Sequence, residues 1–318
     1  MEIFDTKSDY NSDASETLTH DQRLNRVEIK LNEELKKCRE LMEKEKREGV
    51  SSDSEDFNKR GELYKLAFDV APEARRQDIE RLFDWIKPIK GEKAIDLAAG
   101  AGMFSIPLAK ITETRLYAVD PSAVQLNNLN KKKGELDIVT MVGSLSEYST
   151  VEAMSKDVGS IDIITSYGGI HHILDKKENG IVVNKQHEMF KNADKMLKEG
   201  GRFIAGDVGG GTALSRHFEG SVKQHCLTGH TEKWLTKERL GNELLLGTEL
   251  TLVRAEDVNI KWLFNSEREL ALFMKGLHAY DMSDEEVLAD LKAYLGYQKN
   301  GEQFELNWPM LFFHLEKK

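Results

Sequence analysis

Short apolar runs alternate with stretches of helical periodicity from about residue 93 to residue 206. The runs predict buried strands, and apolar residues repeating every three or four positions predict helices. Alternation of the two at this spacing implies a parallel sheet with helices on both faces. The predicted strands lie near 93–97, 115–119, 137–142, 161–165 and 202–206, and the predicted helices near 103–110, 122–133, 150–156 and 186–198.

The stretch 20–48 predicts one long helix, because it is rich in Leu, Lys, Glu and Arg and contains neither Gly nor Pro. Its apolar residues form a single stripe, made of Leu24, Val27, Leu31, Leu35, Cys38 and Met42. A helix this polar needs a partner surface. We assign residues 1–60 to an N-terminal helical arm that either packs or pairs as a coiled coil, which would give a homodimer, or closes over the site as a lid. The polar residues 1–19 are expected to be a flexible tail, and 51–54 a linker or helix start.

Two further helices are expected before the sheet, over about 55–68 and from Pro72 onward, since proline suits the first turn of a helix. Beyond residue 206 the alternation breaks, and inserts are expected at about 207–248 and 266–295. The first insert is rich in loops, whereas the second is expected to be helical.

Capping-box patterns begin at Ser266 and at Ser283, and each predicts the start of a helix. Two more strands are expected, around 251–262 and over 304–315. The last of them contains Pro309, which cannot donate a backbone hydrogen bond. An edge position or a bulge is therefore predicted at this proline.

The first predicted strand runs into a turn of small residues, with the sequence IDLAAGAGM at positions 95–103. The second strand ends in Asp120, 18 residues after Gly102. This is the first half of a nucleotide-binding unit, in which small residues let the backbone approach the ligand and the acid holds both ribose hydroxyls. The candidate ligands are NAD(P) and S-adenosylmethionine. Asp96 favours the second, because a carboxylate would repel a diphosphate but can hold a cationic amino group. Ser105 also stands where a dinucleotide motif has its third glycine.

Residues 61–318 resemble a class I S-adenosylmethionine-dependent methyltransferase of the group that acts on small molecules. Four segments carry the resemblance: the turn at 96–102, the acid Asp120, the fourth strand with its loop at 161–173, and the glycine turn that leads into the fifth strand at 197–205. The resemblance implies an α/β fold with a doubly wound, mostly parallel, seven-stranded Rossmann-like sheet. It also implies an antiparallel edge, formed as a hairpin by the last two predicted strands, and an N-terminal helical cap on a catalytic domain at 61–318.

The resemblance places the cofactor at the carboxyl ends of the strands. The implied cofactor-binding residues are Asp96, Ala98, Gly100, Gly102, Met103, Asp120, Pro121, Ser144, Leu145, Ser166 and Tyr167. Two positions depart from the family pattern. Ala98 replaces the first glycine of the turn, a small change that still allows a close approach. Ser144 stands where the family usually has an acid for the adenine amino group, and an uncharged hydroxyl predicts a weaker contact.

His171 and His172 are the candidate catalytic residues, because they follow the fourth strand, close to where the methyl group should point. A histidine accepts a proton near neutral pH and could serve as a base or orient the acceptor. A purely structural role in this loop is the alternative.

Candidate substrate contacts lie in the first insert and before the sheet. They are Tyr64, His225, His230 and Trp234. The insert should hang over the active-site face, and Tyr64 could close the pocket from above. His217 and Cys226 join the two insert histidines in inviting a metal interpretation, but their spacing matches no short zinc module, and no metal is predicted.

Composition narrows the functional class. The 318 residues have a net charge of −10 and a sequence pI near 5.5, which disfavours nucleic acid as a partner. No apolar stretch is long enough for a membrane span, the N-terminus lacks a secretory signal pattern, and the two cysteines, Cys38 and Cys226, show no pairing pattern. We therefore expect a cytoplasmic protein that acts on a small molecule.

The sequence thus predicts transfer of a methyl group from S-adenosylmethionine to a small metabolite, mainly by proximity and orientation. One alternative keeps the cofactor but releases methylthioadenosine by cyclisation or alkyl transfer. A second is a catalytically silent, cofactor-binding scaffold that acts through the 20–48 helix. An NAD oxidoreductase is the third.

Overall fold

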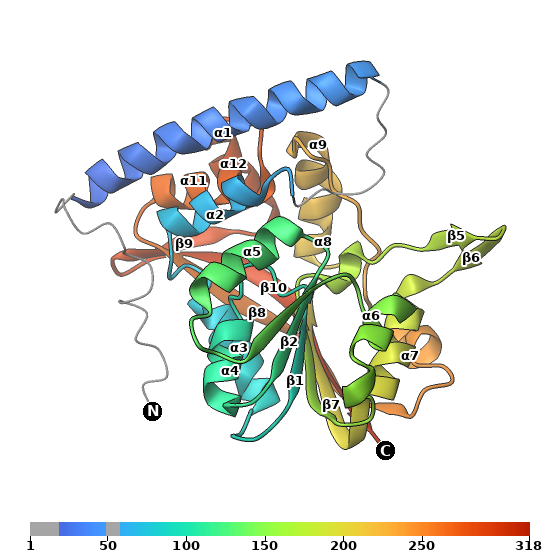
Figure 1. Cartoon of the computed structure of the whole chain (residues 1–318). Helices are drawn as coiled ribbons and strands as arrows, with labels where there is room; N and C mark the ends of the chain where they lie inside the picture. Colours follow the sequence, from blue (N-terminus) through green and yellow to red (C-terminus); the bar gives the residue numbers. More distant parts are fainter. Residues whose placement is uncertain (1–18, 49–57) are drawn as a thin grey trace.

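The computed structural model describes residues 19–48 and 58–318, and its centre is one sheet with helices on both faces (Figure 1). Five parallel strands stand in the order β3-β2-β1-β4-β7. They are β1 (Ala94–Leu97), β2 (Leu116–Asp120), β3 (Ile138–Val142), β4 (Ile161–Tyr167) and β7 (Leu197–Asp207). This confirms the mostly parallel, doubly wound α/β fold predicted from the sequence. The fifth strand begins earlier than predicted, at Leu197, so the helix expected over 186–198 ends at Met196.

Antiparallel strands complete the sheet beside β7. Strand β10 (Gln303–Lys317) lies between β7 and β8 (Leu250–Phe264), and both pairings are antiparallel. The predicted hairpin at the sheet edge is therefore present. A short strand that the sequence did not predict, β9 (Tyr297–Asn300), pairs with the beginning of β10 and makes an eighth strand.

Pro309 is neither on an edge strand nor at a bulge, because β10 is an inner strand and its register shift lies between His314 and Leu315. The prediction was wrong for the strand as a whole, but at Pro309 itself one side of β10 is open, as at an edge. Pairing with β7 begins only at Leu311, so the proline is opposed on one side alone, by Asn259 of β8. The missing N–H therefore leaves no β7 carbonyl without its ladder bond.

Helices cover both faces of the sheet and bury two hydrophobic clusters. One face carries α2 (Gly61–Val70), α3 (Arg76–Ile86), α4 (Ser105–Thr112), α5 (Ala123–Lys132), α11 (Glu267–His278) and α12 (Asp284–Tyr294). The other carries α6 (Tyr148–Ala153), the 3-10 turn η1 (Ser155–Asp157), α7 (Lys185–Met196) and the π-helix η4 (Leu240–Leu244). The third helix begins at Arg76 rather than near Pro72, since residues 72–75 form a turn closed by the Arg76 N–H on the Glu73 carbonyl.

The long helix α1 (His20–Glu48) lies across α2 and α11 in Figure 1. Its predicted apolar stripe is largely buried within the chain, through Leu24, Leu31, Leu35 and Cys38. The helix is thus a packed layer over the helical face, and the division into an arm (1–60) and a catalytic domain (61–318) remains a prediction. The predicted tail to residue 18 and the linker at 51–54 lie outside the described residues. Among the described helices, none is long and apolar enough to cross a membrane.

The two inserts differ from expectation in detail. The first contains short helical turns: α8 (Ala213–His217), the π-helix η3 (Phe218–Val222), α9 (Lys223–His225) and α10 (Lys237–Arg239). In the second, Ser283 and Glu286 form a full capping box, whereas Glu269 accepts from the Asn265 N–H instead of completing the box at Ser266. A small hairpin projects after β4, formed by β5 (Lys176–Glu178) and β6 (Ile181–Val183), and the sequence did not predict it.

Candidate functional site

A cavity of about 510 Å³ lies at the carboxyl ends of the parallel strands, where α/β sheets bind their ligands. Ten of the predicted site residues line it: Tyr64, Ala98, Gly100, Asp120, Pro121, Ser144, Leu145, Ser166, Tyr167 and His172. The predicted cofactor residues Asp96, Gly102 and Met103 are not part of this lining, nor are His171 and the three insert residues His225, His230 and Trp234. The binding assignments themselves remain predictions.

The turn after β1 needs a left-handed backbone at three positions, with φ of 56° at Ala98, 53° at Gly100 and 90° at Gly102. Gly102 is also confined, since a Cβ there would lie 2.3 Å from Cδ1 of Leu129. Ala98 is a non-glycine residue in a conformation that L-residues adopt at a cost. The turn folds as the glycine pattern predicts, with strain at the one position that departs from it.

Asp96 is almost fully buried, with 2% of its surface exposed, and accepts a hydrogen bond from the Ser105 hydroxyl at 2.5 Å. Burial raises the pKa of this carboxyl to about 7, against the opposing effect of that bond. Ser105, which replaces the third glycine of the dinucleotide pattern, is therefore the partner of Asp96. The spacing of the two residues gave no signal of this pairing.

Asp120 lies at the end of β2 and touches the glycine turn. Its Oδ2 accepts from the Gly100 N–H at 2.9 Å, and its Oδ1 accepts from the Ser122 N–H at 2.7 Å. Burial raises the pKa of this carboxyl, and the two backbone donors oppose that rise. The carboxylate is thus fixed in place at the cavity wall.

Ser144 follows β3 and lines the cavity as predicted. Its Oγ lies 2.8 Å from Oγ of Ser146 and accepts from the Ser146 N–H at 3.2 Å. The hydroxyl is therefore already engaged in a local turn, which limits what it can offer to an adenine.

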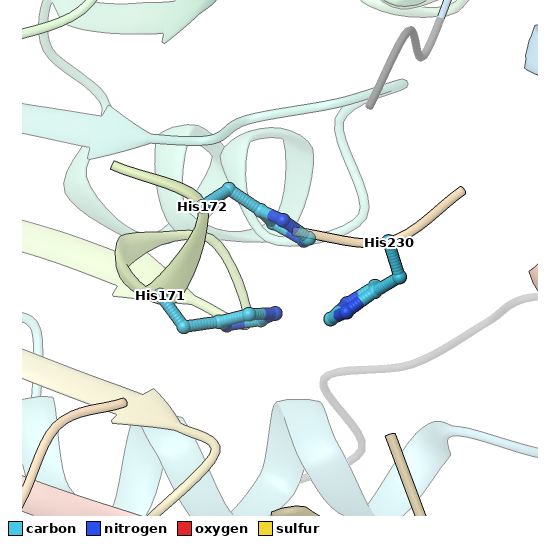
Figure 2. A group of neighbouring side chains, drawn as sticks. All are labelled: His171, His172 and His230. Carbon is cyan, nitrogen blue, oxygen red and sulfur yellow. The ribbon is translucent and has the colours of Figure 1, made fainter. Parts of the chain in front are cut away.

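Three histidines converge beside the cavity (Figure 2). His171 and His172 lie on the 3-10 turn η2 (Ile170–His172) after β4, and His230 comes from the first insert. The Nδ1 atom of His171 is 2.5 Å from Oδ1 of Asp207, a fully buried carboxylate at the end of β7. Burial lowers the pKa of all three imidazoles, to about 4 for His172, so each is neutral at pH 7. From the sequence, His230 was assigned a different role from His171 and His172. Asp207 was not a candidate residue, although its position as an acid at the end of a strand was a visible signal.

The other predicted insert residues do not join this group. The ring of Trp234 stacks on His171 at 5.4 Å between centroids, and its Nε1 donates to Glu219. The side chain of Cys226 contacts the Gly229 carbonyl, and the Tyr280 hydroxyl lies 3.1 Å from Nε2 of His217. His225 ends α9 and lies outside the lining of the cavity. The four insert residues considered for a metal therefore do not form one site.

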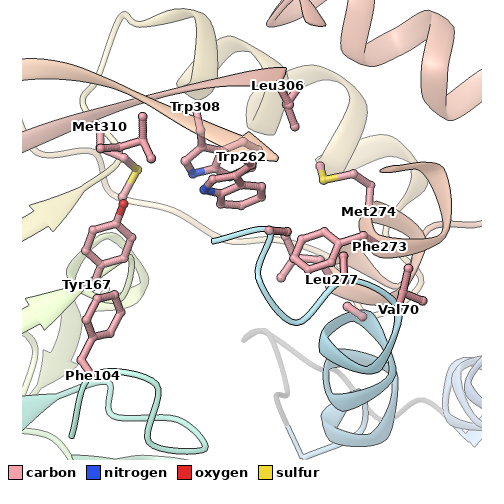
Figure 3. Packing of buried hydrophobic residues seen from close by; sticks show 14 of the residues in the cluster. Val70, Phe104, Tyr167, Trp262, Phe273, Met274, Leu277, Leu306, Trp308 and Met310 are labelled. Atoms are coloured by element: carbon pink, nitrogen blue, oxygen red, sulfur yellow. The ribbon is translucent and has the colours of Figure 1, made fainter. Parts of the chain in front are cut away.

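A buried polar network supports the aromatic wall of the cavity. Asp78 of α3 accepts hydrogen bonds from Arg75, from the hydroxyl of Tyr167 at 2.8 Å and from the indole of Trp262 at 3.0 Å. Tyr167 and Phe104 are neighbours in Figure 3, and their rings stack with centroids 4.8 Å apart. Sequence reasoning missed Asp78, because an acid on an amphipathic helix is usually exposed.

The central part of the chain matches a known family model. Residues 95–205 match the family model described as "Methyltransferase domain". This segment contains the glycine turn, Asp120, Ser144 and both histidines of η2. None of the curated proteins matches the chain in sequence.

Solved structures of low sequence identity share the fold. The YcgJ protein of Bacillus subtilis is 13% identical, with a TM-score of 0.52, over 76% of this chain and 99% of that one. A putative methyltransferase from Bacillus halodurans is 16% identical, with a TM-score of 0.52, over 76% and 98%. A methyltransferase of Thermotoga maritima, described as S-adenosylmethionine-dependent and as a possible histamine N-methyltransferase, is 15% identical, with a TM-score of 0.50, over 82% and 98%. The resemblance predicted from the sequence is confirmed: the chain has the fold of S-adenosylmethionine-dependent methyltransferases, and its residues 95–205 match the methyltransferase-domain model.

Proposed function

We propose that the protein transfers the methyl group of S-adenosylmethionine to a small-molecule acceptor in the cavity at the carboxyl ends of β1 to β4. The observation that carries this proposal is the placement of Asp120 against the glycine turn. Two backbone N–H groups orient its carboxylate, and each oxygen keeps a lone pair with which to accept from a ribose hydroxyl. Asp96 is proposed to favour the cationic part of the cofactor from behind the turn.

The reaction asks the protein mainly for alignment and for exclusion of water. A lone pair of the acceptor attacks the methyl carbon, the carbon–sulfur bond breaks, and its electron pair stays on sulfur to give S-adenosylhomocysteine. Apolar side chains suited to excluding water line the cavity, among them Leu97, Val119, Leu145, Ile170 and Ile173. The rings of Tyr64 and Tyr167 add rigid walls, since both are tied into the Asp78 network.

The acceptor is proposed to be a small molecule. A cavity of about 510 Å³ is within the usual size range of small-molecule sites. The net charge of −10 gives little support to a phosphate-rich polymer. We propose that the acceptor lies within reach of Tyr64 and His172, which both line the cavity. His230 and Trp234 pack around His171 and are not part of the lining. Contact from His225 would require movement of the insert.

Two further expectations belong to this proposal. A reducing, cytoplasmic setting is consistent with Cys38 and Cys226, which are both free and buried. A homodimer through α1 would have to use other surfaces of that helix, because its apolar stripe is mostly buried within the chain.

The fate of the cofactor tests the function. Purified protein is incubated with S-adenosylmethionine, alone and with a metabolite extract, and the products are identified by mass spectrometry. We expect S-adenosylhomocysteine to accumulate only with the extract. Methylthioadenosine formed from the cofactor alone would overturn the proposal in favour of cyclisation or elimination, and cofactor binding without any turnover would favour a scaffold.

A matched pair of variants tests the site. Asp120→Ala should weaken cofactor binding by at least about tenfold in a calorimetric titration, because ribose contacts to a carboxylate are lost. Asp137→Asn is the control, since Asp137 pairs with Arg115 on the surface, with about half of its side chain exposed. If both variants bind S-adenosylmethionine with equal affinity, the assignment of Asp120 to the cofactor site is wrong.

A further inference from the structure

The three histidines bring one ring nitrogen each to a common point. Their candidate ligand atoms all lie within 4.8 Å of one another, and Figure 2 shows the imidazoles of His171, His172 and His230 turned toward one another. Three points so close share a centre no more than about 2.8 Å from each. Zinc–nitrogen bonds are about 2.0–2.1 Å long, so shifts of less than an ångström would bring all three atoms to bonding distance.

The second nitrogen of every ring faces an oxygen acceptor. Nδ1 of His171 is 2.5 Å from Asp207, Nδ1 of His172 is 3.2 Å from the Thr231 carbonyl, and Nδ1 of His230 is 3.0 Å from Oε2 of Glu232. A carbonyl or carboxylate oxygen in this position fixes the proton on Nδ1, as the outer partners of metal-bound histidines do. Nε2 is then the atom that each neutral ring offers with a lone pair.

Asp207 accepts hydrogen bonds on both of its carboxylate oxygens. Its Oδ2 accepts from the Ile170 N–H and its Oδ1 from the Val208 N–H, both at 2.7 Å, in addition to the imidazole. Three donors, two of them on Oδ1, favour the ionised form of this carboxyl, so we assign the proton of the shared bond to His171. The Nε2 atom of His171 is buried and has no hydrogen-bond partner among the described residues.

We propose that His171, His172 and His230 form a site for a single divalent transition-metal ion, with zinc as the ion best suited to three imidazoles. With the proton on Nδ1, no Nε2 atom can donate a hydrogen bond to its neighbours, whereas each can donate a lone pair to a cation. Imidazole nitrogens suit zinc and its neighbours among the first-row metals, and carboxylates at the outer nitrogens strengthen such ligands. From the sequence we predicted no metal, and that prediction rested on the spacing of the insert residues alone. Two of the ligands lie outside the insert.

The role of this ion rests on the proposed function. Three protein ligands leave one coordination position, the arrangement of catalytic rather than structural zinc. His172 and Thr231 line the cavity, so a heteroatom of the acceptor can reach the ion from there. A hydroxyl or thiol bound to the metal loses its proton to solvent more easily, and the resulting anion supplies the electron pair that attacks the methyl carbon. The acceptor class would then be one with a metal-binding oxygen or sulfur.

Metal binding can be measured without any acceptor or cofactor. The full-length protein is stripped with a chelator, and zinc is titrated in competition with a chromogenic chelator. We expect one tightly bound equivalent, and a cobalt-substituted sample should show the visible absorption of a tetrahedral or five-coordinate site. No stoichiometric zinc binding by folded protein would overturn the proposal and leave a bound water as the occupant of the cluster.

Variants locate the ion. His230→Gln should weaken zinc binding at least tenfold, and Glu232→Gln, which keeps the shape of the outer partner, should weaken it about tenfold to a hundredfold. His187→Gln is the matched control, because His187 also places Nδ1 against a backbone carbonyl, that of Leu244 at 3.0 Å, but outside the cluster. Unchanged affinity in His230→Gln, with a native-like thermal melt, would place the metal elsewhere and refute the site.

The two proposals fail separately. Zinc binding is read without S-adenosylmethionine, so its loss leaves the cofactor assay interpretable. If stripped protein still forms S-adenosylhomocysteine at the full rate, the catalytic role of the ion is refuted while methyl transfer stands.

Discussion

Ala98 is the residue at which the glycine turn carries strain. Its φ of 56° is left-handed, it is exposed, and it stands where the family pattern has glycine. Ala98→Gly should raise the free energy of unfolding by about 0.5–1 kcal/mol, because relief of the left-handed backbone exceeds the entropic cost of a new glycine. Urea unfolding of the cofactor-free protein checks this. A less stable variant would mean that the alanine methyl contributes packing that outweighs the strain.

Gly102 provides the opposite test in the same turn. Gly102→Ala adds a Cβ at φ 90° and 2.3 Å from Cδ1 of Leu129, so both the backbone and α5 must shift. We expect a loss of about 2–4 kcal/mol in the same unfolding experiment. Equal stabilities of the two variants would show that the turn is more adaptable than its geometry indicates.

Asp96 makes stability depend on pH in a defined direction. Burial raises the pKa of the folded carboxyl to about 7, whereas the unfolded carboxyl titrates near its ordinary value of 3.8. Between these pH values the unfolded state releases the proton and the folded state retains it, so stability falls as pH rises and the loss is complete above about pH 7. Asp96→Asn removes this titration. From pH 5 to pH 8 its stability relative to the native protein should rise by about 2–3 kcal/mol. A constant difference would mean that Asp96 is ionised in the folded protein.

Sequence reasoning at this scale succeeded where neighbours in the chain are neighbours in space. Asp120 and the glycine turn are read directly from one βαβ unit. His230 follows His172 by 58 positions, and Asp207 comes from a different strand again. These side chains meet only because the first insert folds back over the ends of β4 and β7. A single sequence contains no signal for that arrangement.

A buried ion pair joins the start of α3 to the sheet. Asp78 has no exposed surface and joins Arg75 to Tyr167 of β4 and Trp262 of β8. Asp78→Ala should lower the free energy of unfolding by about 3–5 kcal/mol, because it leaves a buried guanidinium without its partner. The matched control is Glu80→Ala on the same helix, which breaks the half-exposed pair with Arg76 and should cost less than about 0.5 kcal/mol. Similar losses in chemical denaturation would show that the network does not hold the helix.

Element boundaries followed from periodicity for most of the core, and the exceptions have physical causes. The β5–β6 hairpin was missed because each strand has only three residues, largely exposed, and neither the polar β5 nor the apolar β6 shows an alternating pattern. Strand β7 extends back to Leu197 because the glycine turn at 200–201 lies within the strand, at an irregularity in its pairing with β4. Hydrophobic patterns report burial, so they are silent where an element is exposed or irregular.

The whole molecule is layered, and its outermost layer joins the helical face rather than standing apart. Helix α1 is linked to that face by ion pairs from Arg39 to Asp281 and from Glu28 to Arg268, besides its buried stripe. The sequence predicted the helix and its stripe but left open whether the partner was another chain, a lid position or the helical face. That choice depends on surfaces of α2 and α11, which form only when residues far apart in the chain fold together.

Two positions of α1 distinguish an integral layer from a lid that opens freely. Leu31 is fully buried, whereas 62% of the surface of Ile29, on the same helix, is exposed. If α1 unfolds with the rest of the molecule, Leu31→Ala should lower the free energy of unfolding by about 2–4 kcal/mol, because it leaves a cavity against α2 and α11. Ile29→Ala should change it by less than about 0.5 kcal/mol. Guanidinium unfolding followed by circular dichroism measures both. Equal effects, or a separate early transition in which helicity alone is lost, would mean that α1 detaches while the core stays folded, as a lid must.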